Sequence, residues 1–573
     1  MKQKEPRHIL SLIYVLLSVV TLCFFGMSCQ GSDSTESGLL PNHQDELLSR
    51  RSDLQPATIV RQRSSSSDDE RGPDPFGFIV DWGNPDLVAA NGAGIRHIAP
   101  IPWNLLMPDG RSFDIGYLAF LDALVRSTYD NGLEVFIRLR SGGYQGQDGF
   151  TTIPEEDWPI DTTDYSRPPH NGFKNGEWIG SIDKGKAYPP KVLTRDTPGS
   201  TSPWYNFVYA LASRYNGTTP DPERPNEVLP KVKYWALDGE EEMTGRWYGT
   251  ATELYGGVGG DPDVGTLPSF YRAVHAANPD AKVVGGNLTD GTVLIYILHE
   301  MMLERRNYDD ELLQFADDWA RQTQHLQFRT VWVLRSMMES PRYAHARSFV
   351  DALLAAGEYY DILGYHMYST YEYLPDLIQF YREKMAEYGF SKPLWGSETG
   401  IYNVPMESHE IQAQRVIKLL TISLAGGVEH VTYSPMVEYL SQFPFFYALY
   451  SQGVDPYRKL SQNSTAEQVN SLFGYVSRES FSFLAHKVKE KGYQFDHMIR
   501  RGNAELYVFR SGTAGSMFCV GWADEEEASF DPRPELGIPF SAEWDLFDYR
   551  GRPQNASGNL AVSRFPVFLE WVE

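Results

Sequence analysis

The chain has 573 residues and a formal net charge of −24, which argues against nucleic acid or another polyanion as a partner. It contains only three cysteines, two of them within the first 29 residues, so neither a disulfide framework nor a cysteine metal site can form. The length allows more than one domain.

The chain opens with a basic start, an apolar run over residues 9–25 and a short stretch that ends at Cys29. This order is typical of an export signal and predicts that residues 1–29 are not part of the fold. The ending Gly-Met-Ser-Cys resembles a bacterial lipoprotein signal box, which implies a lipid on Cys29 and a membrane attached through it. Plain secretion and an uncleaved anchor stay as alternatives, because the apolar run is nearly long enough to span a bilayer.

Residues 30–75 are polar and poor in large apolar side chains. Such a segment cannot bury enough surface to offset the entropy lost on ordering. We predict a disordered linker, which would hold the following domain away from the membrane.

From residue 76 onward, short apolar runs alternate with segments of helical apolar spacing, the pattern of a parallel sheet covered by helices. Eight runs are predicted to be strands: 76–80, 95–102, 133–139, 232–237, 281–285, 360–365, 393–395 and 428–433. The fold class is therefore α/β, and residues 76–490 are predicted to form a (β/α)₈ TIM barrel. A long polar segment at 141–202 and a largely helical one at 293–356 are insertions in it.

Beyond residue 490 the pattern changes to short strands separated by turn residues. Residues 491–573 are predicted to form a small antiparallel β-sandwich packed against the barrel. It could bind carbohydrate, but a structural role is the simpler interpretation. Cys519 lies in one of these strands and is expected to be a buried thiol.

Acidic residues follow two of the predicted barrel strands. Asp238 and the run Glu240 to Glu242 come after the fourth strand, and Glu398 comes after the seventh. Like charges gathered this closely resist ionising together, and enzymes use such surroundings to keep one carboxylic acid protonated. Because the carboxyl ends of barrel strands converge, two carboxylates there would suit retaining glycoside hydrolysis. A solvated acidic loop is the alternative interpretation of the glutamate run.

Four stretches resemble the clan A glycoside hydrolases, including families such as 39 and 42: Gly94-Ile-Arg-His with Pro108-Asp-Gly110, Lys233 to Glu240, Tyr360 to Tyr368, and Lys392-Pro-Leu-Trp-Gly-Ser-Glu-Thr-Gly400. The last is similar to the motif that carries the nucleophile. The resemblance covers most of the chain from residue 76.

The resemblance implies that Glu240 is the acid/base and Glu398 the nucleophile, with Tyr368 donating a hydrogen bond to Glu398. It also implies that His366 and Arg96 lie near the reacting carboxylates, and that three tryptophans stack on sugar rings: Trp82, Trp103 and Trp395. These aromatic residues could equally be core packing, and Arg96 could form an ion pair of the barrel.

The chain departs from the family pattern around the acid/base. Gly239 stands where the family has an asparagine that holds the sugar 2-hydroxyl, and Glu241 stands where it has a proline. Either a donor such as Asn287 replaces this contact, or substrate choice is altered, or activity is lost. The register also leaves Glu242 as a rival acid.

The expected function is therefore a retaining hydrolase of β-linked oligo- or polysaccharides, lipid-anchored at a bacterial envelope, with no metal and no cofactor. A non-catalytic carbohydrate-binding or scaffold lipoprotein on the same barrel is the alternative. Other hydrolase classes find no support, because the chain lacks a Gly-x-Ser-x-Gly elbow, a zinc-protease histidine pair and a P-loop.

Overall fold

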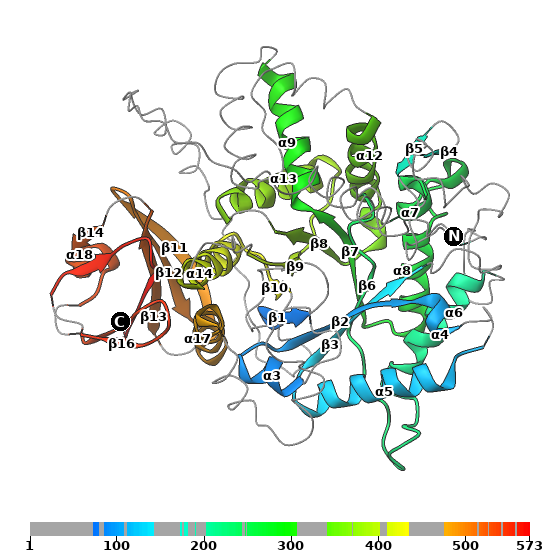
Figure 1. Ribbon diagram of the computed structural model, residues 1–573, viewed down its shortest axis with the longest axis horizontal. Helices are drawn as coiled ribbons and strands as arrows, with labels where there is room; N and C mark the ends of the chain where they lie inside the picture. The colour runs from blue at the N-terminus through cyan, green and yellow to red at the C-terminus, as the bar shows by residue number, and fades with distance from the viewer. Residues whose placement is uncertain are drawn as a thin grey trace, which may run out of the picture. The chain divides into compact units, whose positions relative to one another are not determined.

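The computed structural model (Figure 1) describes residues 73–79, 85–107, 112–141, 172–174, 177–180, 190, 202–242, 247, 249–305, 341–368, 371–401, 409–434, 475–512, 515–524, 527–539, 542–555 and 558–572. The predicted signal and nearly all of the predicted linker lie outside these residues. Within the described ranges, no helix is both long and apolar enough to cross a membrane. The chain divides into two compact units, and the larger one, residues 71–297 and 337–573, contains the eight barrel strands, the carboxy-terminal sheets and the residues of the candidate site.

Eight parallel strands close into a barrel, which confirms the predicted fold class. They are β1 (Phe76–Ile79), β2 (Ile95–Pro102), β3 (Glu134–Arg140), β6 (Tyr234–Leu237), β7 (Lys282–Thr289), β8 (Ile362–Met367), β9 (Leu394–Thr399) and β10 (His430–Tyr433). Each barrel strand pairs with the next barrel strand in chain order, so β3 pairs with β6, and β10 closes the barrel by pairing with β1. All eight predicted strands are present, and β6 and β9 are the fourth and seventh. The long polar segment also holds a small hairpin, β4 (Gly172–Lys174) and β5 (Glu177–Gly180).

Helices alternate with the strands, as predicted. They are α3 (Pro85–Ala90), α4 (Trp103–Leu106), α5 (Ile115–Asp130), α6 (Pro203–Arg214), α7 (Ala251–Tyr255), α8 (Thr266–Ala277), α9 (Asp290–Arg305), α12 (Pro341–Ala355), α13 (Leu374–Glu387), α14 (His409–Ala425) and α17 (Val476–Lys491). Several begin at side chains that accept hydrogen bonds from the first turn: Asp114 for α5, Ser202 for α6, and Thr250 in a capping box with Glu253 for α7.

Alternation along the strands separates two surfaces of the barrel wall. Outward residues pack against the helices in the main core, whereas inward residues form a separate cluster: Ile95, Phe136, Tyr234, Ala236, Val284, Ile362 and Trp395. This apolar layer lies toward the amino ends of the strands. Polar side chains, among them Arg138 and His366, occupy the same faces nearer the carboxyl ends.

The carboxy-terminal part is antiparallel, as predicted. Its six-stranded sheet has the order β11-β12-β13-β18-β15-β16, with β11 (Tyr493–Arg501), β12 (Ala504–Ser511), β13 (Ser516–Ala523), β18 (Val567–Val572), β15 (Trp544–Phe547) and β16 (Pro553–Gln554). A second sheet pairs β14 (Ala528–Phe530) with β17 (Leu560–Val562), and the short helix α18 (Pro532–Leu536) lies between these two strands in sequence. Cys519 is buried in the core of this domain, as expected.

The β domain packs on α14 and α17 of the barrel. Phe483 on α17 contacts Phe568 with ring centroids 4.9 Å apart. Lys418 on α14 is 2% exposed, lies 5.4 Å from the Trp522 ring and forms an ion pair with Asp524. Its ammonium therefore binds the barrel helix to the sheet through one charge and one ring.

Replacing Lys418 with alanine is expected to lower the free energy of unfolding by about 2 kcal/mol, since it removes the ion pair and the ring contact together. Denaturant titration measures the change. Lys231→Ala removes an exposed pair with Asp280 and is the control, expected to have almost no effect. Equal effects in the two variants would contradict a role of Lys418 in this contact.

Candidate active site

Glu240 stands on a tight turn at the carboxyl end of β6. Its φ of 64° is in the left-handed region, which a residue with a side chain seldom adopts. The backbone of the next strand holds the turn, because the Glu240 N–H donates to the Asn287 carbonyl oxygen at 3.0 Å. The turn directs the Glu240 carboxylate toward β8.

Glu398 reaches the same region through a bulge in β9. Pairing with β8 runs from Tyr365 opposite Gly396 to His366 opposite Glu398, so Ser397 is an extra residue in β9. Trp395 faces the interior cluster, and strict alternation would place Glu398 on the outer face. The bulge reverses this and brings Glu398 inward.

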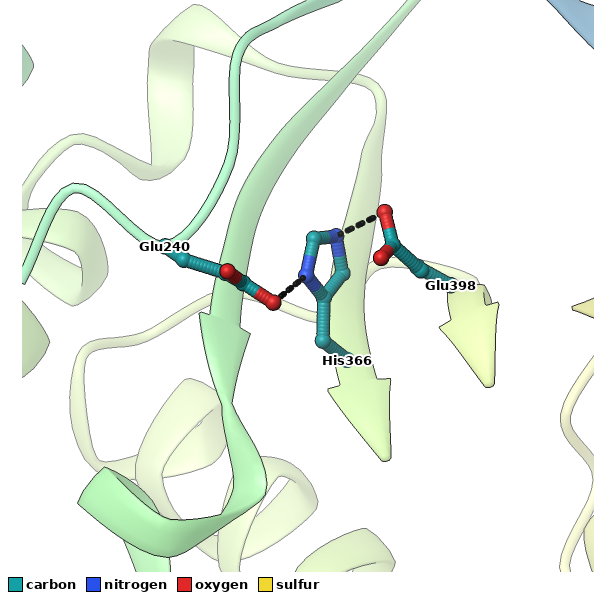
Figure 2. A group of neighbouring side chains, drawn as sticks. All are labelled: Glu240, His366 and Glu398. Atoms are coloured by element: carbon teal, nitrogen blue, oxygen red, sulfur yellow. Dashed lines mark hydrogen bonds and ion pairs between the residues drawn. The ribbon is translucent and has the colours of Figure 1, made fainter. Parts of the chain in front are cut away.

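The imidazole of His366 lies between the two glutamates (Figure 2). Its Nδ1 is 3.0 Å from Glu240 Oε1 and its Nε2 is 3.8 Å from Glu398 Oε2. One oxygen of each glutamate and one His366 nitrogen all lie within 4.8 Å of one another. The His366 side chain is 1% exposed, whereas Glu240 and Glu398 keep 9% and 16%. The two carboxylates therefore retain access that the histidine lacks.

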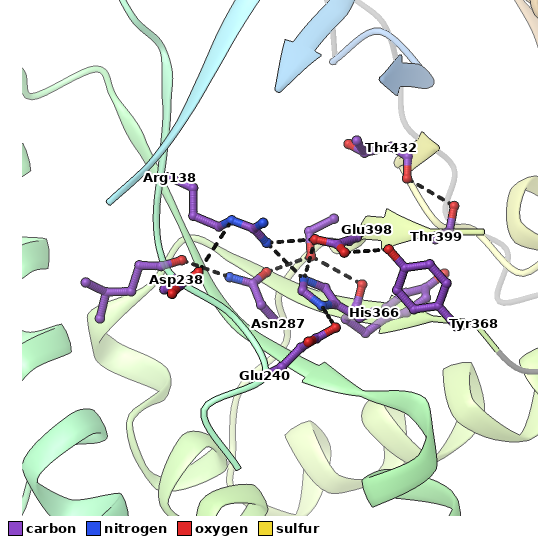
Figure 3. A network of polar contacts seen from close by, with 12 residues as sticks. Arg138, Asp238, Glu240, Asn287, His366, Tyr368, Glu398, Thr399 and Thr432 are labelled. Atoms are coloured by element: carbon purple, nitrogen blue, oxygen red, sulfur yellow. Dashed lines mark hydrogen bonds and ion pairs between the residues drawn. The ribbon is translucent and has the colours of Figure 1, made fainter. Parts of the chain in front are cut away.

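A buried arginine and a tyrosine complete the surroundings of Glu398 (Figure 3). Arg138 on β3 donates from Nη1 to Glu398 Oε2 at 2.9 Å, and the Tyr368 hydroxyl donates to Glu398 Oε1. Burial by itself raises the pKa of Glu398, but the charges of His366 and Arg138, with the Tyr368 hydrogen bond, bring that pKa below its usual value. Burial and the Glu398 charge raise the pKa of Tyr368 well above 10, so the phenol stays a donor.

The hydrogen-bond pattern also indicates the tautomer of His366. Arg138 Nη1 lies 3.4 Å from His366 Nε2, and a guanidinium can only donate. In the neutral imidazole the proton is then on Nδ1 and is donated to Glu240 Oε1. Asp238 supports the arginine from the other side, with its carboxylate 3.9 Å from Arg138 Nε and paired with Arg140.

The structure explains why position 239 is glycine. A Cβ there would lie 2.6 Å from His366 Cε1 and 3.0 Å from Asn287 Cβ. The space that a family asparagine would occupy is thus filled by the histidine that binds Glu240. The glycine at position 239 and the position of His366 therefore depend on each other, because a larger residue at 239 would collide with the imidazole.

The other two glutamates of the run are also buried, in surroundings that differ from those of Glu240. Glu242 accepts hydrogen bonds at Oε1 from both the backbone N–H and the hydroxyl of Thr289, each at 2.7 Å. Glu241 is buried near Asp238, and its burial and that charge raise its pKa well above the usual value. Glu240 is the member of the run that contacts His366, and Glu242, the rival acid, is held at the end of β7.

Three residues expected near the substrate lie elsewhere in the barrel. Arg96 donates to Thr128 on α5, on the outer surface of the barrel wall. Trp103 is 1% exposed and packs with Trp204 and Phe207 in the main core.

Trp395 is fully buried in the interior cluster, where its ring lies 4.6 Å from that of Tyr234. Asn287 does lie beside the two glutamates, but it is 1% exposed and its amide contacts protein atoms. Trp82 and Cys29 are outside the described residues.

Arg138 is the site residue that sequence reasoning missed. The run Glu-Val-Phe-Ile-Arg-Leu-Arg of β3 carries Arg138 and Arg140 two residues apart at the carboxyl end of a buried strand. Two cations on one face at that end indicate carboxylate partners nearby, and this signal was present in the sequence. His97 on β2 is fully buried inside the barrel and stacks on Phe136.

Glu240, His366 and Glu398 have the residue types of a metal site, but their contacts do not fit one. His366 turns a different nitrogen toward each glutamate, and a single ion cannot bind both nitrogens of one imidazole. The Arg138 guanidinium already occupies Glu398 Oε2 and His366 Nε2. We therefore interpret Glu240 and Glu398 as a pair of acidic residues with the His366 imidazole between them.

No family model and no curated protein matches the chain. Among solved structures, it is similar to a family 39 glycoside hydrolase from Bacteroides cellulosilyticus WH2, with 13% identity over 88% of this chain and 82% of that chain and a TM-score of 0.49. A GH30 endoxylanase from Clostridium papyrosolvens C71 gives 11% identity, coverage of 88% and 97% and a TM-score of 0.45. A GH39 β-xylosidase from Caulobacter crescentus gives 12% identity over 89% of this chain and 98% of that chain, with a TM-score of 0.43. At this level of similarity no family is assigned, and the function has to be inferred from the site.

Glu242 is expected to make stability depend on pH. Burial raises its pKa from 4.5 to about 7, so the folded state binds a proton that the unfolded state has lost. The stability that this proton contributes is present below about pH 4.5 and is lost as the pH rises through 7. Glu242→Gln keeps the acceptor oxygen for Thr289 and removes the titration.

The variant should therefore be more stable than the wild type at pH 8, by about 3 kcal/mol for a shift of this size, and nearly equal to it at pH 4.5. Unfolding measured across this range at fixed salt gives the difference directly. A constant difference at every pH would show that Glu242 does not titrate there.

Proposed function

We propose that the protein is a retaining glycoside hydrolase acting on β-linked glycans. The observation that supports this most directly is the pair Glu240 and Glu398, with an oxygen of each within 4.8 Å of the other at the carboxyl ends of the fourth and seventh strands. Retaining enzymes hold their carboxyl groups about 5–5.5 Å apart, whereas inverting enzymes need about 6.5–9.5 Å to admit a water molecule.

In the proposed first step, Glu398 attacks the anomeric carbon. A bond forms between that carbon and a Glu398 oxygen while the glycosidic C–O bond breaks, and Glu240 transfers its proton to the departing oxygen. In the second step Glu240 takes a proton from water, the water oxygen bonds to the anomeric carbon, and Glu398 leaves as a carboxylate. Two displacements at one carbon retain its configuration.

The surroundings of the two glutamates match these roles. Arg138 and Tyr368 hold Glu398 in the ionised form that a nucleophile needs. Glu240 accepts the His366 proton at Oε1, so the proton to be transferred belongs on Oε2. This chemistry requires one carboxylate that stays charged, as the nucleophile, and one carboxyl group that carries a proton, as the acid. In the proposal Glu398 is the first and Glu240 the second.

A non-catalytic carbohydrate-binding protein on the same barrel is the second candidate. Gly239, in place of the residue that contacts the sugar 2-hydroxyl in the family, is the observation that favours it. Arg138 favours the enzyme, because a binding module has no need of a buried cation that keeps one carboxylate ionised.

Turnover of aryl β-glycosides with an activated leaving group tests the proposal. Glu398→Ala should lose turnover, and azide should restore it by forming the α-glycosyl azide, because a single displacement inverts the anomeric carbon. Glu240→Ala should keep the first step on activated substrates, lose about 10²–10⁴-fold in the second, and form the β-glycosyl azide. Product configuration is read by NMR.

Glu242→Gln is the matched control, since it changes a glutamate two residues from Glu240 whose carboxylate is bound to Thr289. It should keep the wild-type product and most of the rate. A wild-type protein that binds glycans and turns over none would support the second candidate. Loss of turnover in Glu242→Gln with full activity in Glu240→Ala would make Glu242 the acid.

The proposal includes a bacterial envelope location with a lipid on Cys29, supported by the basic start, apolar run and Gly-Met-Ser-Cys ending of the sequence. Expressed in a bacterial host with labelled palmitate, the full chain should carry the label and fractionate with membranes. Cys29→Ser should lose the label, whereas Cys23→Ser should keep it. Label in both variants, or in neither the wild type nor the variants, would exclude lipidation at Cys29.

A further inference from the structure

A hydrogen bond crosses β8 directly beneath the two glutamates. Ser397 Oγ on β9 donates to Asn287 Oδ1 on β7 at 2.6 Å. These strands are not neighbours in the barrel, since β8 lies between them. We call this contact the Asn287–Ser397 bridge.

Both ends of the bridge are bulge residues. In β7, pairing with β8 passes from Gly286 to Leu288, so Asn287 is an extra residue, with a left-handed φ of 60°. In β9, the extra residue is Ser397. In β7 the bulge turns Asn287 inward, whereas regular alternation from the inward Val284 would have turned it outward. Ser397 lies on the same face of β9 as the inward Trp395, and its hydroxyl meets the Asn287 amide.

Gly364 of β8 leaves the space for the bridge. A Cβ at this position would overlap Asn287 Oδ1 and would lie 2.9 Å from Ser397 Oγ. Because only hydrogen stands there, the bridge passes over the strand without displacing it. The bridge therefore depends on features of three consecutive strands, namely a bulge in β7, a glycine in β8 and a bulge in β9.

The bridge joins the supports of the two glutamates. Ser397 immediately precedes Glu398 in β9. Asn287 holds the Glu240 turn from two points, through its carbonyl oxygen to the Glu240 N–H and through Nδ2 to the Leu237 carbonyl oxygen at 3.4 Å. A shift at either end of the bridge would therefore be transmitted to a carboxylate.

We infer that Asn287 and Ser397 are positioning residues that set the separation between Glu240 and Glu398. The inference rests on the proposed hydrolase function and assigns Asn287 a role other than contact with the sugar. Asn287 is 1% exposed, and its oxygen is taken by Ser397 and its nitrogen by Leu237. Neither residue would touch the substrate, and both act through the carboxylates that do.

The test uses variants that remove the bridge without forcing a new backbone. Asn287→Gly retains the left-handed φ and the backbone bond to Glu240 and deletes the side chain, with its bonds to Ser397 and Leu237. Ser397→Ala deletes the other partner. Each is expected to lower kcat by about 10- to 100-fold with KM nearly unchanged, since displaced groups slow the reaction without loosening the substrate.

Three comparisons separate positioning from simple loss of stability. The double variant should lose no more kcat than the worse single one, because the two residues act through one contact. Ser397→Thr, which keeps the hydroxyl, should recover most of the rate. Asn278→Ala removes another buried amide, one that bonds the Val232 carbonyl oxygen before β6, and should lower stability while leaving kcat unchanged.

Crystal structures of the wild type and Asn287→Gly provide a readout that needs no activity. The separation of the Glu240 and Glu398 carboxyl groups should change while the other barrel strands superpose. Unchanged kcat in both single variants, or an unchanged separation, would overturn the inference. If the wild type turns over no glycoside, the proposed function fails, and the separation alone then decides whether the bridge positions the two residues.

Discussion

Two carboxylates inside a barrel repel each other, and the site depends on how this repulsion is offset. Glu240 and Glu398 lie within 4.8 Å, and the cation and the imidazole between them come from two other strands. Burial would lower the pKa of Arg138, but Glu398, Asp238 and Glu240 together raise it above its usual value. The arginine is therefore a permanent charge, and Glu398 is the carboxylate that it keeps ionised.

This arrangement gives the two glutamates different characters although they have the same side chain. Glu398 receives two donors, a guanidinium and a phenol, and its pKa falls. Glu240 receives one imidazole proton and lies on the turn that also carries the buried Glu241 and Glu242. The proposed reaction needs this difference, because it uses one carboxylate that stays ionised and one carboxyl group that can carry a proton.

Several backbone irregularities of the barrel lie beside the two glutamates. Glu240 and Asn287 are non-glycine residues at positive φ, and Ser397 and Asn287 are bulge residues. Strain of this kind persists only where surrounding contacts hold it, and here the contacts are the Glu240–Asn287 backbone bond and the Asn287–Ser397 bridge. Regular strands alone would have produced a barrel without this site.

The barrel, its eight strands, the antiparallel domain and the two strand ends that bear acids could all be predicted from the amino-acid sequence. The strands and helices could be predicted because apolar periodicity is a local property of the sequence. The meeting of the acidic residues could be predicted because the carboxyl ends of the strands of such a barrel lie together. The resemblance of residues 360–368 to the family motif also implied that His366 and Tyr368 lie beside the acids. Only the tertiary structure placed Arg96 and Trp103 outside the wall and Trp395 beneath the site.

Tertiary structure also decided what the bulges do. Alternation counted from Trp395 places Glu398 on the wrong face, and no local pattern shows the extra residue that corrects it. Gly239 looked like a missing contact in the sequence, whereas in the fold it is the space that His366 occupies. Spacing along one strand is readable from the chain, but contacts between strands distant in sequence are set by packing.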